Sequence, residues 1–498
     1  MKKKIAFTLM ICLVAYFAFA AGQGEKVQEV LRIGINSEPV TVLTPSMSTS
    51  AMCQMMNRST HSTLIDIEPG TEKFIPDLAE SWTASDSGTV LTFNLRKGVK
   101  FHNGAELKAS DVVYSFAERL PKGAIAALAK TIVKTEALDD YTVKVTLSGS
   151  QQDILYTISS PCASIVNKKA VEKEGNNGEK YGTGPYKIEE YVQGEYVRMV
   201  RFDNYFGELP KTKELRWKII VEDSSRSLAL ETGEIDVCYS PANSDVPYIR
   251  KSKDLEVISV DGLNLYYIGF NTQAAPFNDP KVRQAIAQAV NKQDAIKVAF
   301  EGYASPAENV MAPAVPLYTP VKGYEYNVTK AKATLKQSSY PNGFKCTVWV
   351  DRVDEEQMCI VFKDNLAKIG IDMQVLLLEA TTLKASWKNN DYQMCLQKFG
   401  NTAGPDMSFS YVFAKTASAN RSRVNDPKID SAIDAAAVQA DPKKRAKMYT
   451  DLNQYITDEA YWVPICIPQV FVGVRKGLQG AVYVGNTSHN FTYAYLSL

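Results

Sequence analysis

The stretch PDLAESWTASDSGTVLTFNLRKGVKFHNGAELKASDVVYSFAER, residues 76–119, says most about the fold of this chain. Apolar and polar side chains alternate along residues 91–95, which predicts a strand with one buried face. Gly88 and Gly104 mark turns before and after that strand. Ser110 is the predicted N-cap of a following helix, because an apolar stripe begins just after it. The stretch therefore predicts a strand–turn–helix unit.

The order of residues in this stretch also carries family information. Three elements stand out: LAESW (78–82), FNLRKGVKFH (93–102) and ASDVV (109–113). Two later elements are TGPY (183–186) and PFNDPKVRQAI (276–286). Together they resemble the signature of the extracellular solute-binding proteins of ABC importers, family 5, which includes the oligopeptide-, dipeptide- and nickel-binding proteins. The resemblance points to a protein that binds and delivers a solute.

The resemblance implies an α/β chain with the two-lobed periplasmic-binding-protein type II fold and an inserted third subdomain. Such lobes close around a ligand by hinge motion. The chain is expected to cross between the lobes near residues 264–266 and to return near residues 470–472. The expected boundaries are residues 21–47, 174–264 and 471–498 for lobe I, 48–173 for the inserted subdomain of lobe I, and 265–470 for lobe II.

Periodicity in the residues also favours an α/β fold. Strand-like runs occur at residues 31–35 and 344–350, and helix-like runs at residues 355–369 and 443–456. Asp279 followed by proline predicts a further helix start, with apolar residues recurring on one face after it. Strands that alternate with helices indicate α/β rather than all-β architecture.

The first 20 residues have the pattern of a cleavable signal peptide. A basic start at residues 2–4 precedes an apolar run at residues 5–17 and the small-residue site AFA at 18–20. The run is short for a membrane span, although a retained anchor stays an alternative. The mature chain is expected to begin near Ala21, and Cys12 is misplaced for a lipid anchor. We therefore expect a periplasmic protein without a lipobox.

Composition and charge are those of a soluble globular protein. The chain has 498 residues, of which 45% are hydrophobic and 22% charged. Removal of residues 1–20 leaves 53 basic and 55 acidic side chains, a balance that gives no sign of a nucleic-acid partner. Seven cysteines remain, so at least one is unpaired, and the sequence leaves one disulfide open.

The residues for catalysis or metal binding are scarce. The chain has three histidines, His61, His102 and His489, and each is better explained by a structural role than by catalysis. The sequence has none of the common metalloprotease or nucleophile-elbow motifs. We therefore predict no enzyme activity, no metal site and no cofactor.

The ligand is expected to meet the segment KFGNTAGPD, residues 398–406. The resemblance implies a Trp and an Asp here in peptide binders, and the Asp pairs with the peptide ammonium group. Phe399 stands at the Trp position and Asn401 near the Asp position. An uncharged Asn departs from that pattern and counts against a ligand with a free amino terminus. Asp406 either substitutes or caps a turn after the preceding proline.

Three further residues are candidates for ligand contact. Arg352 follows a predicted strand and fits an anionic ligand group, or else forms a surface ion pair with Asp354 or Glu355. Glu38 ends the first strand and faces the cleft or the solvent. Met52 offers a pliable apolar wall or fills the core.

The predicted function is capture of a peptide or similar small solute and its delivery to a membrane permease. The expected partners are that ligand and the permease and ATPase subunits of the importer, and the protein is expected to be monomeric. An oligosaccharide, an opine or a metal chelate stays open as the ligand. A ligand-presenting sensor for a chemoreceptor is the alternative from another class, and a secreted hydrolase is disfavoured.

Overall fold

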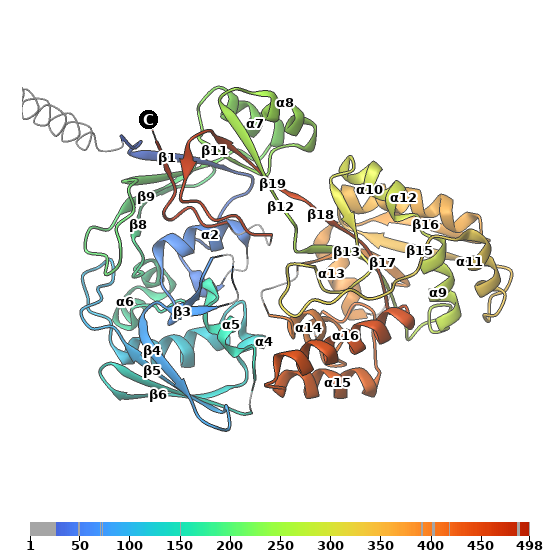
Figure 1. Ribbon diagram of the computed structural model, residues 1–498, viewed down its shortest axis with the longest axis horizontal. Coiled ribbons are helices and arrows are strands. Elements are labelled where there is room, and N and C mark those ends of the chain that lie inside the picture. Colours follow the sequence, from blue (N-terminus) through green and yellow to red (C-terminus); the bar gives the residue numbers. More distant parts are fainter. Residues whose placement is uncertain are drawn as a thin grey trace, which may run out of the picture.

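The structure is a computed structural model that describes residues 26–47, 50–69, 71, 73–149, 151–389, 392–400, 404–417, 419–485 and 489–497. The predicted signal peptide, residues 1–20, and Asn401 lie outside the described residues. In the described part, three larger sheets define three bodies. In Figure 1, two of these bodies lie to the left and right, and the third lies below the left one.

The first body, which we call lobe I, is built on a seven-stranded mixed sheet. In sheet order, its strands are β12 (Leu255–Val260), β19 (Val470–Arg475), β11 (Val237–Tyr239), β1 (Val30–Ile35), β10 (Glu214–Ile219), β9 (Tyr196–Arg201) and β8 (Tyr186–Val192). β1 runs parallel to β10 and β11. Helix α2 (Ala51–Thr60) packs Met52, Met55 and Met56 into the same core as Trp217 of β10.

The second body, lobe II, is built on a six-stranded sheet between two layers of helices. In sheet order, its strands are β14 (Ala304–Pro306), β18 (Trp462–Pro468), β13 (Asn264–Phe270), β17 (Met394–Gly400), β15 (Phe344–Val350) and β16 (Ile371–Leu377). Alternate residues of β13 belong to different cores, because strand side chains point to opposite faces. Tyr266 and Ile268 face one helical layer, and Leu265 and Tyr267 face the other.

The third body, the inserted subdomain, has a four-stranded antiparallel sheet with its own apolar core. In sheet order, its strands are β4 (Ala79–Ala84), β5 (Val90–Leu95), β7 (Thr142–Leu147) and β6 (Ile132–Asp139). The predicted strand at residues 91–95 is confirmed as β5. Two small ladders pair β2 (Ile65–Ile67) with β3 (Phe74–Pro76), and β20 (Leu478–Gln479) with β21 (Tyr495–Leu496).

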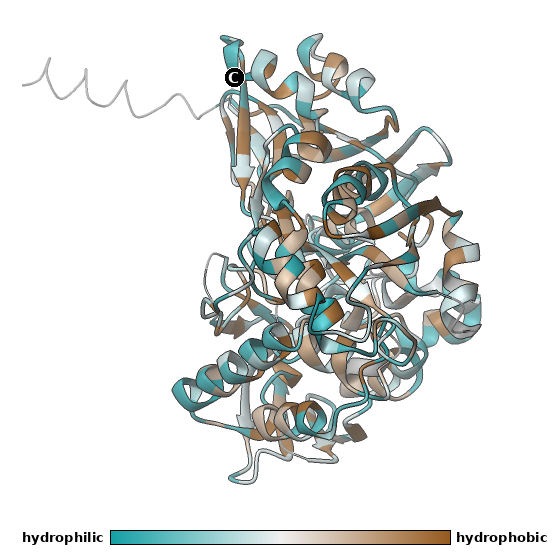
Figure 2. Cartoon of the chain, turned by 90° about the vertical axis from the view of Figure 1, so that its right-hand side faces the viewer, coloured by the Kyte–Doolittle hydropathy of each residue, from teal (hydrophilic) through white to brown (hydrophobic). Residues whose placement is uncertain are grey.

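The remaining helices cover these sheets. They are α3 (Ala109–Tyr114), α4 (Ala126–Ala129), α5 (Ile154–Ile158), α6 (Lys168–Glu174), α7 (Asp223–Glu231), α8 (Val246–Lys251), α9 (Pro280–Ala289), α10 (Lys292–Phe300), α11 (Val328–Leu335), α12 (Val353–Ala367), α13 (Ala380–Asn389), α14 (Met407–Phe413), α15 (Pro427–Val438) and α16 (Pro442–Asp458). Short 3-10 helices are η1 (Pro45–Met47), η3 (Leu120–Lys122), η4 (Pro161–Ala163), η5 (Gly175–Lys180) and η6 (Asn243–Asp245), and η2 (Ser115–Arg119) is a short π-helix. Figure 2 shows hydrophobic and hydrophilic residues around the same helices, as amphipathic packing requires.

The predicted helix starts are partly right. Asp279 caps α9 as expected, because its carboxylate accepts the Lys281 backbone N–H at 2.8 Å. The predicted N-cap Ser110 is wrong, since α3 begins at Ala109 and its N-cap is Lys108. The carboxylate of Asp111 replaces a hydroxyl cap by accepting the backbone N–H of Lys108 at 3.0 Å.

Two single crossings join the lobes. β12 of lobe I leads into β13 of lobe II, and β18 of lobe II leads back into β19 of lobe I. The crossings pack closely, because a Cβ atom at Gly262 would lie 2.1 Å from the carbonyl oxygen of Pro468. The backbone N–H of Leu263 also donates to the carbonyl of Gly485 at 2.9 Å. The exact lobe boundaries predicted from the sequence stay a prediction.

All seven cysteines after the predicted signal peptide are free thiols and buried. They are Cys53, Cys162, Cys238, Cys346, Cys359, Cys395 and Cys466. The disulfide that the sequence left open is therefore not formed. Among the described residues, the structure contains no helix with both the length and the apolar character needed to span a bilayer.

We predict that Gly262→Ala destabilises the protein, because the added methyl group has to displace the backbone of the neighbouring crossing. The expected cost is about 1–3 kcal/mol, as for other overpacked sites. Thermal unfolding followed by circular dichroism measures it. Gly149→Ala is the matched control, since a Cβ atom there has nothing within 4 Å. Equal melting temperatures for the two variants would contradict the prediction.

Candidate functional site

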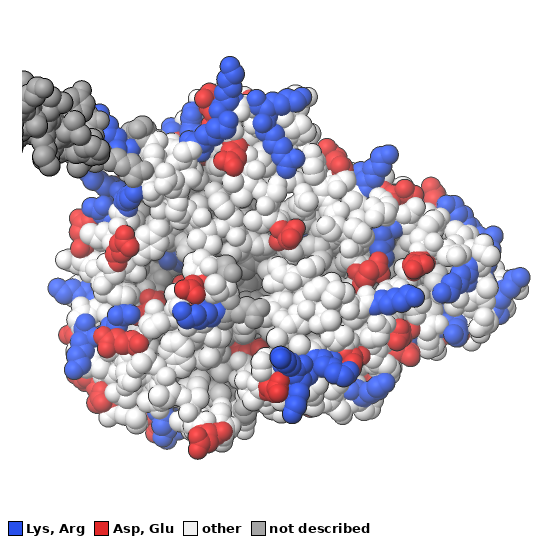
Figure 3. Space-filling model, in the orientation of Figure 1, with Lys and Arg blue, Asp and Glu red and all other residues white. Residues whose placement is uncertain are grey.

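The candidate site lies between the lobes, where Figure 3 shows the surface hollowed. On lobe II, β15 runs parallel to both β16 and β17, so these strands end at the same edge of the sheet. In open α/β sheets, ligands bind outside the carboxyl ends of such strands. Arg352 lies two residues after the end of β15, and Phe399 lies near the end of β17. The structure thus brings two of the predicted site residues to one edge.

Arg352 and Lys398 place two cations at this edge. The strand register aligns Trp349 of β15 with Cys395 of β17, and the charge of Arg352, beyond the end of β15, acts on Lys398 of β17. The pKa of the Lys398 ammonium group is lowered by desolvation and by the positive charge of Arg352. Arg352 is about half exposed and contacts Asp354 through Nε at 3.3 Å. The predicted ion pair with Asp354 is present, Tyr266 also hydrogen-bonds the guanidinium, and the remaining N–H donors can meet another partner.

A buried acid, Glu355, lies close to these cations. Glu355 is 1% exposed, and its carboxylate accepts the backbone N–H of Asp351 at 3.1 Å and the amide of Gln397 at 3.3 Å. Burial raises the pKa of Glu355 to about 8. Its other oxygen, Oε1, has no hydrogen-bond partner. At neutral pH this carboxyl is therefore mostly protonated, and it does not neutralise the nearby cations.

Aromatic side chains form the base of the same edge. Phe399 is 7% exposed and meets Trp462 edge-on, with ring centroids 5.8 Å apart. Tyr411 lies nearly parallel to Phe399 at 6.5 Å. The ring of Tyr267 also stacks on Trp462, with ring centroids 3.4 Å apart. The packing holds Phe399 in one orientation.

Asp406 lies elsewhere, at the contact between lobe II and the inserted subdomain. Its side chain is buried and makes no capping bond to α14, so the predicted turn-capping role is not seen. The hydroxyl of Tyr449 reaches its carboxylate at 3.5 Å, and its backbone N–H donates to Asp153 at 2.8 Å. Burial, followed by the charge of Asp153, raises the pKa of Asp406 to about 6.

The other two predicted contacts are occupied within lobe I. The carboxylate of Glu38 accepts the hydroxyl of Tyr191 and the backbone N–H of Gly194, the latter at 3.0 Å. Glu38 is therefore held against the β8–β9 hairpin. Met52 is 3% exposed in the core under α2, which agrees with core filling. Asp153 was not named from the sequence, and Lys398 only as the first residue of the ligand segment, because their roles depend on contacts between distant segments. The surface ion pair of Arg352 with Glu355 that the sequence left open is not formed, because Glu355 is buried.

The three histidines have structural surroundings. His61 Nε2 donates to the carbonyl of Glu179 at 2.7 Å, and His102 Nε2 donates to that of Gly184 at 2.9 Å. His489 Nδ1 accepts the backbone N–H of Val484 at 3.1 Å. Burial lowers the pKa of each histidine to about 4. Within the described ranges, no three His, Cys, Asp or Glu side chains are grouped as metal ligands.

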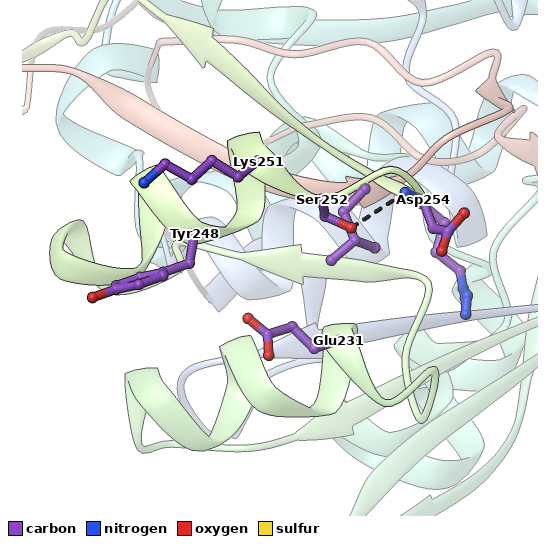
Figure 4. Close-up of a pocket in the computed structure, with 7 residues that line it drawn as sticks. Glu231, Tyr248, Lys251, Ser252 and Asp254 are labelled. Atoms are coloured by element: carbon purple, nitrogen blue, oxygen red, sulfur yellow. Dashed lines mark hydrogen bonds between the residues drawn. The ribbon is translucent and has the colours of Figure 1, made fainter.

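Two cavities lie within one half of the molecule. The larger, about 400 Å³, is on the outside of lobe I and has Glu231 from α7 on one wall and Tyr248 and Lys251 from α8 on the other (Figure 4). The smaller, about 320 Å³, lies between α2, β3 and the C-terminal segment, with Asp77 and Tyr205 in its lining. Neither cavity is lined by residues of lobe II.

Comparison with known proteins gives a consistent result. The family described as bacterial extracellular solute-binding proteins, family 5 middle, matches residues 73–421. Glutathione-binding protein GsiB of Escherichia coli K12 is 28% identical over 99% of this chain and 98% of its own length. The solved structure of DppA from Helicobacter pylori with the peptide STSA is 29% identical, has a TM-score of 0.82 and covers 95% of this chain and 99% of that one. AgaA from A. tumefacien R10, solved with agropinic acid, is 26% identical with a TM-score of 0.79 and covers 93% of this chain and 98% of that one.

The chain belongs to the family 5 bacterial extracellular solute-binding proteins. The type II periplasmic-binding-protein fold predicted from the sequence is confirmed by the likeness to DppA. The chain is a solute-binding protein, and its family is one of binding proteins rather than enzymes.

We predict that Glu355→Gln stabilises the protein at pH 8 but not at pH 5. The folded-state pKa of about 8 lies above the ordinary value of 4.5, so the folded protein keeps a proton that the unfolded chain loses. Stability from this group therefore falls as pH rises from 4.5 to 8, and glutamine removes that loss. The expected gain at pH 8 is roughly 1–3 kcal/mol. Denaturant unfolding at both pH values measures it, with Glu356→Gln as the neighbouring control, and an equal gain at both would contradict it.

Proposed function

We propose that this protein is the periplasmic binding component of an ABC importer for small anionic peptides. The observation that carries the proposal is the Arg352–Lys398 pair at the carboxyl edge of lobe II. Two neighbouring cations repel each other, and a carboxylate between them relieves that repulsion. Arginine is also well shaped to hold a carboxylate with two parallel hydrogen bonds.

The relatives support a peptide of this kind. GsiB is a glutathione-binding protein, and DppA was solved with the peptide STSA. A peptide has at least one carboxylate that can bind the cation pair. The buried aromatic base at Phe399 limits how deeply the peptide can enter the site. The lobes close around the ligand, and the closed protein then docks on the permease and its ATPase to deliver it. Residues 1–20 act as the export signal.

An opine is the second candidate ligand, because AgaA was solved with agropinic acid. Opines share the carboxylate with peptides, so the cation pair serves either one. The absence of a charged residue at position 401 favours a ligand whose amino group is modified or held by another residue.

The test is isothermal titration calorimetry of the purified mature protein with glutathione, the peptide STSA, agropinic acid and maltotriose. We predict binding of at least one of the three compounds that carry a carboxylate and none of maltotriose. For that compound, Arg352→Ala weakens binding at least tenfold, which is about 1.4 kcal/mol. Arg352→Lys keeps the charge and loses less.

Lys345→Ala is the matched control, because Lys345 lies on the same strand at its opposite end and is 89% exposed. Its affinity is expected to equal that of the wild type. Binding of maltotriose, or an Arg352→Ala variant with unchanged affinity, would contradict the proposal.

A further inference from the structure

The inserted subdomain touches lobe II through a charged residue. Asp153 precedes α5, whose residues Ile154 and Ile158 belong to the core of the inserted subdomain. Its carboxylate accepts Nη2 of Arg445 on α16 at 2.6 Å and the backbone N–H of Asp406 at 2.8 Å. In Figure 1, α4 and α5 face α14 and α16 across the gap between the halves. One side chain therefore bridges the two bodies.

This bridge is buried. The side chains of Asp153 and Arg445 are each 8% exposed. Beside them, the backbone N–H of Gln152 donates to the carbonyl of Ala437 at 3.2 Å, and a Cβ atom at Gly404 would lie 3.0 Å from Asp153. A buried ion pair is costly to break on one side, since the remaining charge stays without water. When the lobes separate, both charges regain solvent instead.

A second carboxylate, Asp406, lies close to this ion pair and feels the charge of both its members. Asp406 lies beside Asp153, and the groups that face it are Asp153 from the inserted subdomain, Arg445 and Tyr449 from α16, and the hydroxyl of Ser410 from α14. Tyr449 also accepts Nη2 of Arg445 at 3.1 Å. Two carboxylates and one cation leave one negative charge in excess within a buried cluster, and protonation of one carboxyl removes that excess.

We propose that Asp153 and Arg445 form a latch that holds the inserted subdomain against lobe II, and that Asp406 takes up one proton from solvent as the latch closes. The proposal rests on the proposed solute-binding function, in which the closed form is the one that holds the ligand. Separation of the lobes returns Asp406 to water and moves the charge of Asp153 away. The proton is then released to solvent.

The direction of the pH effect follows from this exchange. In the closed form, burial raises the pKa of Asp406 to about 6, whereas the ordinary value is 3.8. The closed form therefore binds more protons at intermediate pH, and closure strengthens as pH falls through 6. Between pH 7.5 and pH 5, the closing equilibrium constant is expected to rise about tenfold.

Single-molecule energy transfer on the full mature chain without solute tests the latch. Dyes are placed at Lys134→Cys in the inserted subdomain and Lys345→Cys in lobe II, which are 63% and 89% exposed. The native cysteines are buried and stay unlabelled. The wild type is expected to show about tenfold more closed molecules, relative to open ones, at pH 5 than at pH 7.5. No such rise would overturn the proposal.

Three variants separate the two parts of the proposal. Asp406→Asn is expected to close as readily at pH 7.5 as at pH 5, and Asp153→Asn to open at both. Asp434→Asn, on the exposed face of α15, is the control and follows the wild type. A wild-type pH response in Asp406→Asn overturns the proton uptake, and wild-type closure in Asp153→Asn overturns the latch. Thermal unfolding of each variant checks that it is folded.

Because no solute is added, the two proposals fail separately. If the calorimetric titrations show no anionic ligand but closure still responds to pH through Asp406, the latch stands and the proposed ligand class is wrong. If an anionic ligand binds but closure ignores both aspartates, the ligand class stands and the latch is wrong.

Discussion

The rest of this structure depends on one constraint: the chain passes between its two larger sheets at two closely packed crossings. Near Gly262, the two crossing segments leave no room for a side chain. Each sheet is otherwise complete within its own lobe, with strands borrowed from distant parts of the sequence. Two short covalent links with little bulk allow the bodies to rotate as units, which is the geometry of a hinge. The interlobe surfaces can then separate without disturbing either core.

Much of the fold could be read from the sequence, because its signals are local. The alternation in residues 91–95 sets β5, and Asp279 with the following proline sets the start of α9. Ser110 misled because a hydroxyl at a helix start is a common cap, whereas here Asp111 supplies the bond to the backbone. The local sequence does not show whether Ser110 or Asp111 accepts the backbone N–H at the helix start.

The site was less predictable, because its chemistry depends on residues far apart in the sequence. Arg352 was chosen for its place after a strand, but its proximity to Lys398 becomes visible only in the folded structure. Asp406 was chosen by resemblance, and the structure gives it neighbours from α16 and from the inserted subdomain. Glu38 and Met52 were predicted from local patterns as ligand contacts. In the structure, Glu38 hydrogen-bonds within lobe I and Met52 packs in the core of lobe I. Burial and long-range register decided each of these outcomes.

The seven free cysteines carry a consequence for redox chemistry. Burial raises the pKa of six of these thiols, to about 12 for Cys238, Cys346 and Cys395, so almost none of the six is a thiolate at neutral pH. Thiolates are the reactive species in disulfide exchange, and the folded chain therefore resists an oxidising compartment without any crosslink of its own. The unfolded chain loses that protection at once. Folding itself, rather than disulfide pairing, is therefore what keeps these thiols unreactive.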